Sequence, residues 1–251
     1  MRRVLILQAR TGSSRLPGKI LLDVAGRPML AQQLRRLLRC RSLDEIVVAT
    51  SLRNRDDFVV ALARAEGVRW FRGDENDVLG RFLGAAREAR ADLIVRSTAD
   101  CPLIDPEVAD RVVETLSTSA GAGAGVGDYA ANVLRRTFPR GLDTEALFRD
   151  VLERVARLAR APADREHVTL YLRRTRPDLF LLHSVEDAED NSDLRWTVDT
   201  EADLAFVRAA YEACGLADEV VPYRRILAWV RSHPSLALPD LESHGYAHPA
   251  R

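Results

Sequence analysis

The sequence predicts an α/β protein with a Rossmann-like, mostly parallel sheet flanked by helices. Short, nearly continuous runs of Val, Ile and Leu recur in the first half of the 251-residue chain, and segments of helical spacing separate them. Such runs are typical of strands buried on both faces, and helices between them imply right-handed crossovers between parallel strands. Hydrophobic residues make up 47% of the chain, which is enough to bury the core of a large domain.

The first half is expected to contain strands and helices in alternation. The expected strands are 4–7, 45–50, 68–71 and 93–95, and the expected helices are 28–39, 56–66, 78–90 and 105–117. Asp105 and Pro106 mark the start of the last of these helices, because Asp is a favoured N-cap and Pro suits the first helical position.

The second half has a different composition and a less regular order of strand-like and helical segments. Residues 119–127 are mostly Gly and Ala and follow a helix, which favours a flexible surface connection over a phosphate-binding loop. Strand-like segments at 128–132, 179–184 and 194–198 then mix with helical segments near 146–160, 164–174, 201–213 and 223–232. Since there is no internal repeat and no clear linker, we expect one domain over 1–251, in which 128–235 extends the sheet formed by 1–118.

The charge balance and the cysteines argue against several classes of protein. The chain has 37 basic and 37 acidic residues, whereas a general nucleic-acid or membrane-surface binder needs a basic excess. Cys40, Cys101 and Cys214 are widely spaced, which disfavours a disulfide framework or a zinc site and favours the reducing cytoplasm. No apolar run suits a signal peptide or a membrane span, and the His-containing tail 244–248 is interpreted as a frayed terminus.

The strongest sign of chemistry is a loop that directly follows the first expected strand. It reads Gln8-Ala9-Arg10-Thr11-Gly12-Ser13-Ser14-Arg15-Leu16-Pro17-Gly18-Lys19. Ligands bind at this end of the strands in open α/β sheets, and exposed backbone N–H groups in such a loop form an anion site. Gly12 permits a sharp turn, and Ser13 and Ser14 add hydroxyl donors. The pattern matches neither GxGxxG nor GxxxxGK(S/T), so it disfavours a Rossmann cofactor site and a Walker loop.

The same loop carries a group of cations. Arg10, Arg15 and Lys19 suit a triphosphate, because a guanidinium group forks onto two phosphate oxygens and an ammonium acts as a compact point charge. Lys19 is the single lysine among 37 basic residues. Codon usage explains why arginine outnumbers lysine, but it does not explain why the one lysine is at position 19. The alternative is an exposed basic turn without a ligand.

Asp100 and Asp199 are the candidate metal ligands. Asp100 follows the fourth expected strand, and a carboxylate that faces a polyphosphate needs a cation between them, which implies Mg²⁺. Asp199 follows the strand expected at 194–198 and offers a second carboxylate. The alternative for each residue is a capping or turn role, and the run from Thr200 to Asp203 resembles a helix start.

These motifs, in this order, resemble the spore-coat polysaccharide biosynthesis protein F family. That family is related to the cytidylyltransferases that activate sugar acids of the 3-deoxy-manno-octulosonate and acylneuraminate type. The resemblance covers nearly the whole chain and rests on the segments 8–19, 44–50, 72–79, 100–105, 138–143, 165–169 and 194–199. Thr11, Ser14 and Ala99 depart from the family pattern, which usually has Met, Thr and Gly at these positions.

The resemblance implies a nucleotide-diphospho-sugar transferase (GT-A-like) fold and a set of site residues. The implied nucleotide-binding residues are Gln8, Ala9, Arg10, Gly12, Ser13, Ser14, Arg15, Lys19, Arg72, Gly73, Asp77 and Thr98. The implied metal ligands are Asp100 and Asp199, and the implied acceptor-binding residues are Arg140, Glu145, Arg165, Glu166, His167 and Trp196. The catalytic role, stabilisation of charge on the phosphates, is assigned to Lys19, Arg10, Arg15 and Asp100.

The implied activity is Mg²⁺-dependent transfer of a nucleoside monophosphate to a small-molecule acceptor, with release of pyrophosphate. CTP as the donor is implied by the resemblance alone; the acceptor would be a sugar, a sugar acid or a similar compound for a surface polysaccharide or a specialised metabolite. A homodimer is expected by analogy. Because this chemistry depends on positioning and electrostatics, it needs no protein nucleophile, and Cys101 is interpreted as a packing residue. His167 is interpreted as either a structural residue or a base.

Two other functions remain open from the sequence. The same fold serves glycosyltransferases that use a nucleotide sugar, and fold alone does not fix function. A nucleotide-binding protein without catalysis would also keep the loop. The cationic loop favours a triphosphate over a nucleotide sugar, and the presence of both Asp100 and Asp199 argues against an inactive protein.

Overall fold

A mixed sheet organises the protein. Within the residues that the computed structural model describes, 1–119 and 127–240, seven strands pair in the order β5-β4-β1-β6-β8-β7-β9. Their bounds are β1 Arg3–Gln8, β4 Glu45–Ser51, β5 Arg69–Gly73, β6 Leu93–Thr98, β7 Tyr129–Ala131, β8 Glu145–Phe148 and β9 Leu182–Ser184. A small antiparallel ribbon of β2 (Asp23–Val24) and β3 (Arg27–Pro28) is separate from this sheet.

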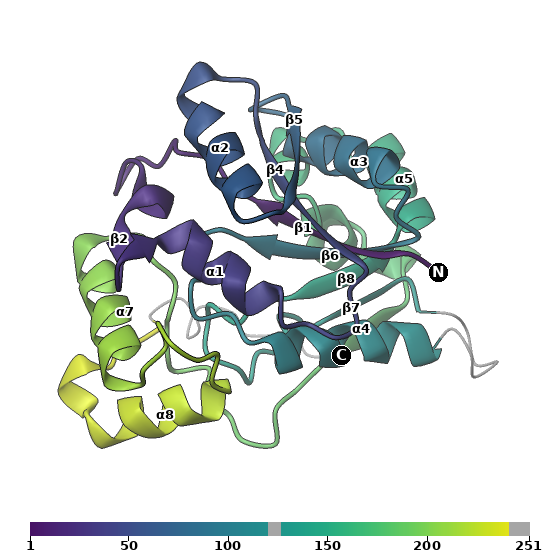
Figure 1. The fold of residues 1–251 in the computed structure, drawn as a ribbon. Helices are drawn as coiled ribbons and strands as arrows, with labels where there is room; N and C mark the ends of the chain where they lie inside the picture. The colour runs from purple at the N-terminus through teal and green to yellow at the C-terminus, as the bar shows by residue number, and fades with distance from the viewer. Residues whose placement is uncertain (120–126, 241–251) are drawn as a thin grey trace.

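Helices cover both faces of the sheet (Figure 1). The α-helices are α1 Met29–Leu37, α2 Asp57–Ala65, α3 Val78–Glu88, α4 Pro106–Ser119, α5 Arg149–Leu158, α6 Pro162–Glu166, α7 Glu201–Ala213 and α8 Tyr223–Ser232. Short 3₁₀ turns cover Lys19–Leu21, Asn54–Asp56, Pro177–Leu179 and Pro234–Leu236, and a π-turn covers Tyr171–Thr175.

The first half confirms the predicted parallel sheet. β1 pairs in parallel with both β4 and β6, and β5 pairs in parallel with β4. Because successive side chains of a strand point to opposite faces, β1 contributes to two separate cores. Leu5 and Leu7 are buried with residues of α1, α4, α7 and α8, whereas Val4 and Ile6 are buried with residues of α3 and α5. This two-sided burial explains why the strand sequence is continuously apolar.

The second half differs from the expectation in three segments. Residues 146–148, expected to begin a helix, belong instead to β8, which runs antiparallel to β6, and Ala146 and Leu147 are buried on opposite faces of the sheet. The strand expected at 194–198 makes isolated bridges from Arg195 and Leu194 rather than a ladder. The helix expected over 164–174 is interrupted, because α6 ends at Glu166 and Val168 adopts a φ of 52°.

Two features of the sequence fall outside the described residues. These are residues 120–126 of the Gly- and Ala-rich stretch and the tail 244–248. Across the part of the chain that the structure describes, no helix combines the length and the apolar character needed to cross a membrane. The cysteines Cys40, Cys101 and Cys214 carry free thiols, and Cys101 and Cys214 are buried.

Capped helix starts and one backbone contact position the candidate site. Asp105 accepts hydrogen bonds from the N–H groups of Glu107 and Val108 at 2.8 and 3.1 Å, as expected for the N-cap of α4. Thr200 and Asp203 form the expected capping box at the start of α7. The N–H of Val198 donates to the carbonyl of Asp100 at 2.9 Å. That bond brings the residue after Val198 next to the carboxyl end of β6.

Candidate active site

Two cavities of about 520 Å³ each contain most of the charged residues predicted for the site. The first cavity is lined by Arg15, Thr98, Asp100, Cys101, Arg140, Asp143, Arg195, Thr197, Asp199, Thr200, Pro239 and Asp240. The second cavity is lined by Arg10, Asp74, Glu75, Asn76, Asp77, Arg160, Pro162, Arg165 and Glu166. The loop after β1 contributes a cation to each cavity, Arg15 to the first and Arg10 to the second.

Lys19 lies between the two predicted metal ligands. Its Nζ donates hydrogen bonds to the carbonyl of Val198 at 2.6 Å and to Oδ1 of Asp199 at 2.8 Å. The same Nζ lies 4.0 Å from Oδ2 of Asp100. Only 12% of the Lys19 side chain is exposed, so this charge is held in place by its partners rather than by solvent. The fold therefore brings together three residues that the sequence places far apart.

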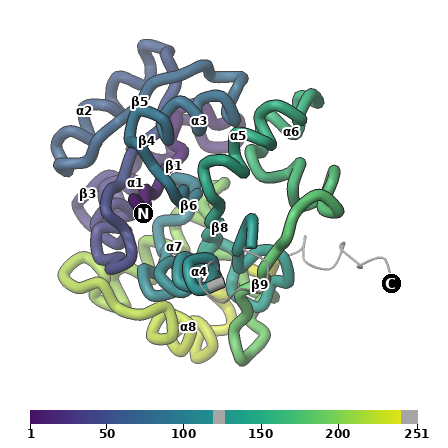
Figure 2. The backbone as a smooth tube through the Cα atoms, turned by 90° about the vertical axis from the view of Figure 1, so that its right-hand side faces the viewer, coloured from purple at the N-terminus to yellow at the C-terminus, as the bar shows by residue number. Residues whose placement is uncertain are grey.

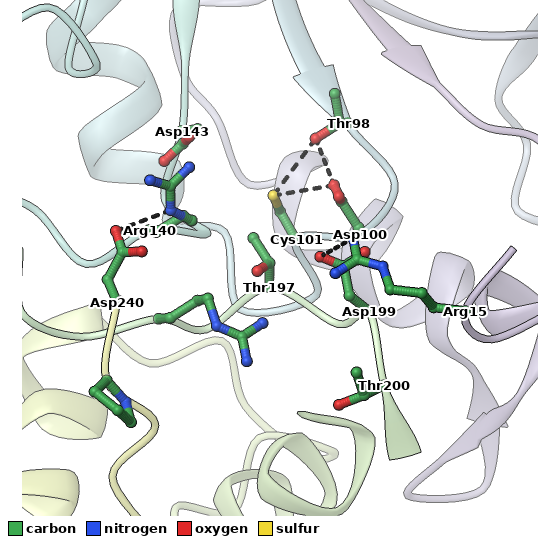
Figure 3. Close-up of a pocket in the computed structure, with 12 residues that line it drawn as sticks. Arg15, Thr98, Asp100, Cys101, Arg140, Asp143, Thr197, Asp199, Thr200 and Asp240 are labelled. Atoms are coloured by element: carbon green, nitrogen blue, oxygen red, sulfur yellow. Dashed lines mark hydrogen bonds and ion pairs between the residues drawn. The ribbon is translucent and has the colours of Figure 1, made fainter. Parts of the chain in front are cut away.

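Arg15 and Thr98 complete this end of the first cavity (Figure 3). Nη2 of Arg15 lies 3.1 Å from Oδ2 of Asp199, so both oxygens of that carboxylate face a cation. The hydroxyl of Thr98 donates to Oδ1 of Asp100 at 2.5 Å, and the Cys101 thiol lies 3.5 Å from the same oxygen. Burial raises the pKa of Cys101 well above its usual range, which keeps the thiol protonated and agrees with a packing role.

The other end of the first cavity alternates arginines with carboxylates. Nε of Arg140 donates to Asp240 at 2.9 Å (Figure 3), and Arg195 forms an ion pair with Asp203. Arg136 donates to both oxygens of Asp143, at 2.6 and 2.8 Å. Burial opposes ionisation of Asp143, but Arg136 holds its pKa below the usual range. This wall is therefore charged throughout and suits a polar ligand.

The carboxylates of Asp100 and Asp199 fit a magnesium ion by their chemistry. Both offer hard oxygen donors, and Mg²⁺ in proteins typically binds one or two carboxylates and completes its shell with phosphate oxygens and water. The described residues contain no group of three or more His, Cys, Asp and Glu suited to a metal. Two carboxylates are within the number that Mg²⁺ takes from a protein when phosphate oxygens and water supply the rest.

The second cavity lies between the β5–α3 loop and α6. Figure 2 shows α6 beside α5, on the side of the sheet that α3 covers. Asp77 caps α3 by accepting from the N–H of Gly80 at 2.9 Å, and Nη2 of Arg165 donates to it at 2.7 Å. Burial would raise the pKa of Asp77, but the bonds from Arg165 and Gly80 hold it below its usual range. Arg10 faces Glu166 across this cavity at 4.0 Å.

Several predicted nucleotide-binding residues lie outside the cavity walls. Arg72 donates to the carbonyls of Ser51 and Arg53 and forms an ion pair with Asp57, so it braces the end of β4. Gly73 lies against Arg81, whose Cγ would be 2.9 Å from a Cβ at this position. The remaining residues outside both linings are Gln8, Ala9, Gly12, Ser13, Ser14 and Lys19, although Lys19 contacts the lining residue Asp199.

Two predicted acceptor-binding residues lie in the interior, so the structure differs from the expectation at both. Trp196 is fully buried in the core beside α7, and its backbone N–H donates to the carbonyl of Arg140 at 2.6 Å. Glu145 is buried among Arg96, Arg173, Tyr129 and Thr169. Burial opposes its ionisation, yet Arg96 and Arg173 lower its pKa to about 2. Neither side chain lines either of the two cavities described above. His167 is exposed directly after α6, close to Glu166 in sequence but outside the second cavity's lining.

Sequence reasoning missed several wall residues. Asp143 and Arg195 both lie inside segments that carried the resemblance, 138–143 and 194–199, so their charges were a signal that could have been used. Arg160 and Asp240 had no such signal, because only the folded chain brings α6 and the C-terminal segment to the cavities.

A mixed sheet of this topology, with a cationic loop facing two carboxylates, defines a nucleotidyltransferase of the nucleotide-diphospho-sugar transferase fold. The sequence profile of the cytidylyltransferase family matches residues 4–212, and the chain belongs to this family of enzymes. It is 31% identical to the spore coat polysaccharide biosynthesis protein SpsF of Bacillus subtilis, over 86% of this chain and 88% of that protein.

Two further similarities agree with this assignment. The solved structure of a cytidylyltransferase from Leptospira borgpetersenii superposes with a TM-score of 0.88 at 32% identity, covering 94% of this chain and 96% of that one. A 3-deoxy-manno-octulosonate cytidylyltransferase of Anaeromyxobacter dehalogenans is 36% identical over 55% of this chain and 57% of its own length.

Proposed function

We propose that this cytidylyltransferase uses Mg²⁺ and CTP to transfer CMP to a sugar acid or a related sugar, with release of pyrophosphate. The observation that carries the proposal is the cluster of Lys19, Arg15, Asp100 and Asp199 at one end of the first cavity. The similarity to a 3-deoxy-manno-octulosonate cytidylyltransferase supports a sugar acid as the acceptor class.

The reaction requires one bond to form and one to break at the α-phosphorus. An acceptor oxygen attacks this phosphorus, the bond to the bridging oxygen of the β-phosphate breaks, and pyrophosphate leaves with that oxygen. The acceptor hydroxyl passes its proton to solvent water. Negative charge accumulates on the phosphate oxygens, so groups held in position with positive charge accelerate the reaction.

Lys19 and Arg15 are placed to meet that charge. In the structure both cations neutralise Asp199, and Asp100 is held by the hydroxyl of Thr98. When the triphosphate binds, these cations exchange carboxylate oxygens for phosphate oxygens. Asp100 and Asp199 would hold magnesium, which supplies Lewis-acid stabilisation of the phosphate oxygens.

The two ends of the site suit the two substrates. Arg140 and Arg195 line the first cavity, and their guanidinium groups suit a carboxylate on a sugar acid. The second cavity, with Arg10 and Asp77, is assigned to the nucleoside of CTP. The loop after β1 then places the α-phosphate between the cavities.

A thermal-shift screen with CTP, UTP, GTP and ATP, each with and without Mg²⁺, tests the donor directly. A ligand that binds only the folded state raises the melting temperature, by an amount set by its concentration relative to Kd. We expect the largest shift with CTP and Mg²⁺ together. Equal shifts with all four nucleotides, or none, would contradict the proposed donor.

A further inference from the structure

Arg81 of α3 is a buried cation with one half of its guanidinium group satisfied. The residue is 2% exposed. Its Nη1 donates to the carbonyls of Asp74 and Glu75, two residues that line the second cavity. Its Nε and Nη2, in contrast, are buried and have no hydrogen-bond partner among the described residues. Burial is the main cause that lowers the pKa of Arg81, and the nearby charge of Arg10 adds to it.

The unsatisfied atoms form one edge of the group. In a guanidinium, the N–H of Nε and one N–H of Nη2 point the same way and donate in parallel. Leaving such donors buried without acceptors costs free energy, and an arginine is retained in that state only if something offsets the cost. The stem of Arg81 is also closely accommodated, since a Cβ on Gly73 would lie 2.9 Å from its Cγ.

We propose that Arg81 is the residue that selects the base, by donating from Nε and Nη2 to two adjacent acceptors of cytosine. This inference rests on the proposed function. Cytosine presents O2 and N3 as neighbouring acceptors. Uracil carries a proton on N3, so the same edge would place a donor against a donor. Adenine has no pair of adjacent acceptors on its exposed edges, whereas guanine has O6 and N7. The free edge therefore distinguishes CTP from UTP and ATP.

Gln8 offers a group that complements the rest of the base. It ends β1, two residues after Ile6, which is buried with Val78 and Phe82 of α3. The Gln8 side chain therefore lies on the face of the sheet that α3 covers. Its Oε1 is buried and has no partner among the described residues, so it is able to accept from the 4-amino group of cytosine. The Gln8 amide can also rotate and donate a hydrogen bond to a base that presents an acceptor, so it does not separate cytosine from uracil. Arg81 has donors only, so the discrimination between the two bases is assigned to it.

The base reaches Arg81 through the wall of the second cavity. Nε and Nη2 are out of contact with solvent, and the residues bonded to Nη1 belong to that wall. Asp74 and Asn76 are exposed, so the loop over 74–76 is free of core packing on its outer side. For the edge of Arg81 to meet a nucleotide whose phosphates are held by the loop after β1, the loop over 74–76, which Glu75 ties to Arg53 and Arg55, has to shift.

Binding of CTP and of UTP, each with Mg²⁺, is measured by calorimetry for the wild type and for Arg81→Lys and Arg81→Met. A bidentate contact of this kind is worth about 1–3 kcal/mol of discrimination, so the wild type is expected to prefer CTP by about fivefold or more. In both variants the ratio of the two Kd values is expected to fall to about 3 or less, because lysine donates from a single point.

Arg36 provides a matched control, since it is also 2% exposed but donates from Nε and Nη2 to the carbonyls of Ile104 and Val221. We expect Arg36→Lys to lower the melting temperature and to leave the CTP-to-UTP ratio unchanged. Without nucleotide, Arg81→Met is expected to melt at or above the wild-type temperature, because it removes an uncompensated buried charge.

Three results would overturn the inference. An unchanged ratio in the Arg81 variants would do so, and so would an equal loss of CTP and UTP binding together with a lower melting temperature. A wild type that prefers GTP would overturn the choice of base. The first two outcomes leave the proposed function standing, whereas a preference for GTP would also contradict CTP as the donor. A wild type that binds no nucleoside triphosphate would contradict both proposals.

Discussion

The ammonium of Lys19 and the carboxylate of Asp199 lie 2.8 Å apart, although 180 positions separate them in the chain. The contact joins the loop after β1 to the segment before α7, and the bond from Lys19 to the carbonyl of Val198 reinforces it. This closure defines one end of the first cavity, and it explains why the lone lysine of the chain is neither a surface residue nor a solvated charge.

Replacement of this lysine by arginine is expected to remove most activity while the protein folds normally. A guanidinium is planar and larger than an ammonium, so it cannot occupy the same point between two carboxylates and a crowded set of phosphate oxygens. Loss of one such electrostatic contact typically costs about 100-fold in turnover. Steady-state kinetics and thermal unfolding of Lys19→Arg provide the measurement.

The exposed residue Arg39 supplies a control for that exchange. Arg39→Lys is expected to keep wild-type turnover, since it lies outside both cavities. If Lys19→Arg also turned over at the wild-type rate, the single lysine would be explained by codon usage and the assigned role of Lys19 would be withdrawn.

Asp100→Asn and Asp199→Asn are expected to weaken metal binding. Each change replaces a carboxylate by a neutral amide, so the affinity for Mn²⁺ as a spectroscopic substitute should fall in the presence of CTP. Electron paramagnetic resonance measures the free ion without relying on turnover. Asp193→Asn, which breaks a surface pair with Arg231, is the matched control. Wild-type Mn²⁺ affinity in both site variants would show that the metal ligands are assigned incorrectly.

The buried network around Glu145 is expected to make the stability of the fold depend on pH in the acidic range. The pKa of Glu145 is lowered from 4.5 to about 2, so the ionised network stabilises the fold above pH 4.5 and this contribution is lost as the pH falls towards 2. Glu145→Gln should therefore melt at a lower temperature at pH 7, and its difference from the wild type should shrink at pH 2–3. A difference that stayed constant with pH would contradict the assigned ionisation, and exposed Glu212→Gln should behave as the wild type.

Gly141 holds the wall of the first cavity through a conformation that suits glycine. It has a φ of 114°, and a Cβ there would lie 2.8 Å from the carbonyl carbon of Trp196. Gly141→Ala should therefore be strongly destabilising and should raise the KM for the acceptor. Gly215 has a φ of 67° but open space around it, so Gly215→Ala isolates the conformational cost, about 1–2 kcal/mol. Equal unfolding free energies for the two variants would exclude the close approach to Trp196.

The sequence allowed the parallel half of the fold to be predicted because its strands are apolar on both faces and its helices are capped locally. Val4 to Leu7 and the Asp105–Pro106 pair carry their structural information within a few residues. The second half was harder to predict because tertiary contacts override the local pattern. Glu145 begins a strand since Arg96 lies opposite it on β6, and the segment after Asn191 is fixed by bridges to residues far away in sequence.

The same distinction holds for the site. Lys19, Asp100 and Asp199 follow strands or precede helices, so their placement at one edge of the sheet followed from the order of elements. Trp196 and Glu145 were assigned by the family resemblance, which does not reveal which way a side chain faces. Nothing in the sequence around Arg81 predicts its burial, because an arginine in an amphipathic helix is normally expected to face solvent.

The most direct test of the proposed function is pyrophosphate release from CTP, UTP, GTP and ATP with Mg²⁺ across a panel of sugar acids and sugars. We expect pyrophosphate with CTP, dependent on both the metal and an acceptor, together with a CMP-linked product. Absence of pyrophosphate with every nucleotide and acceptor, alongside sugar transfer from a nucleotide sugar, would contradict the proposal and identify a glycosyltransferase.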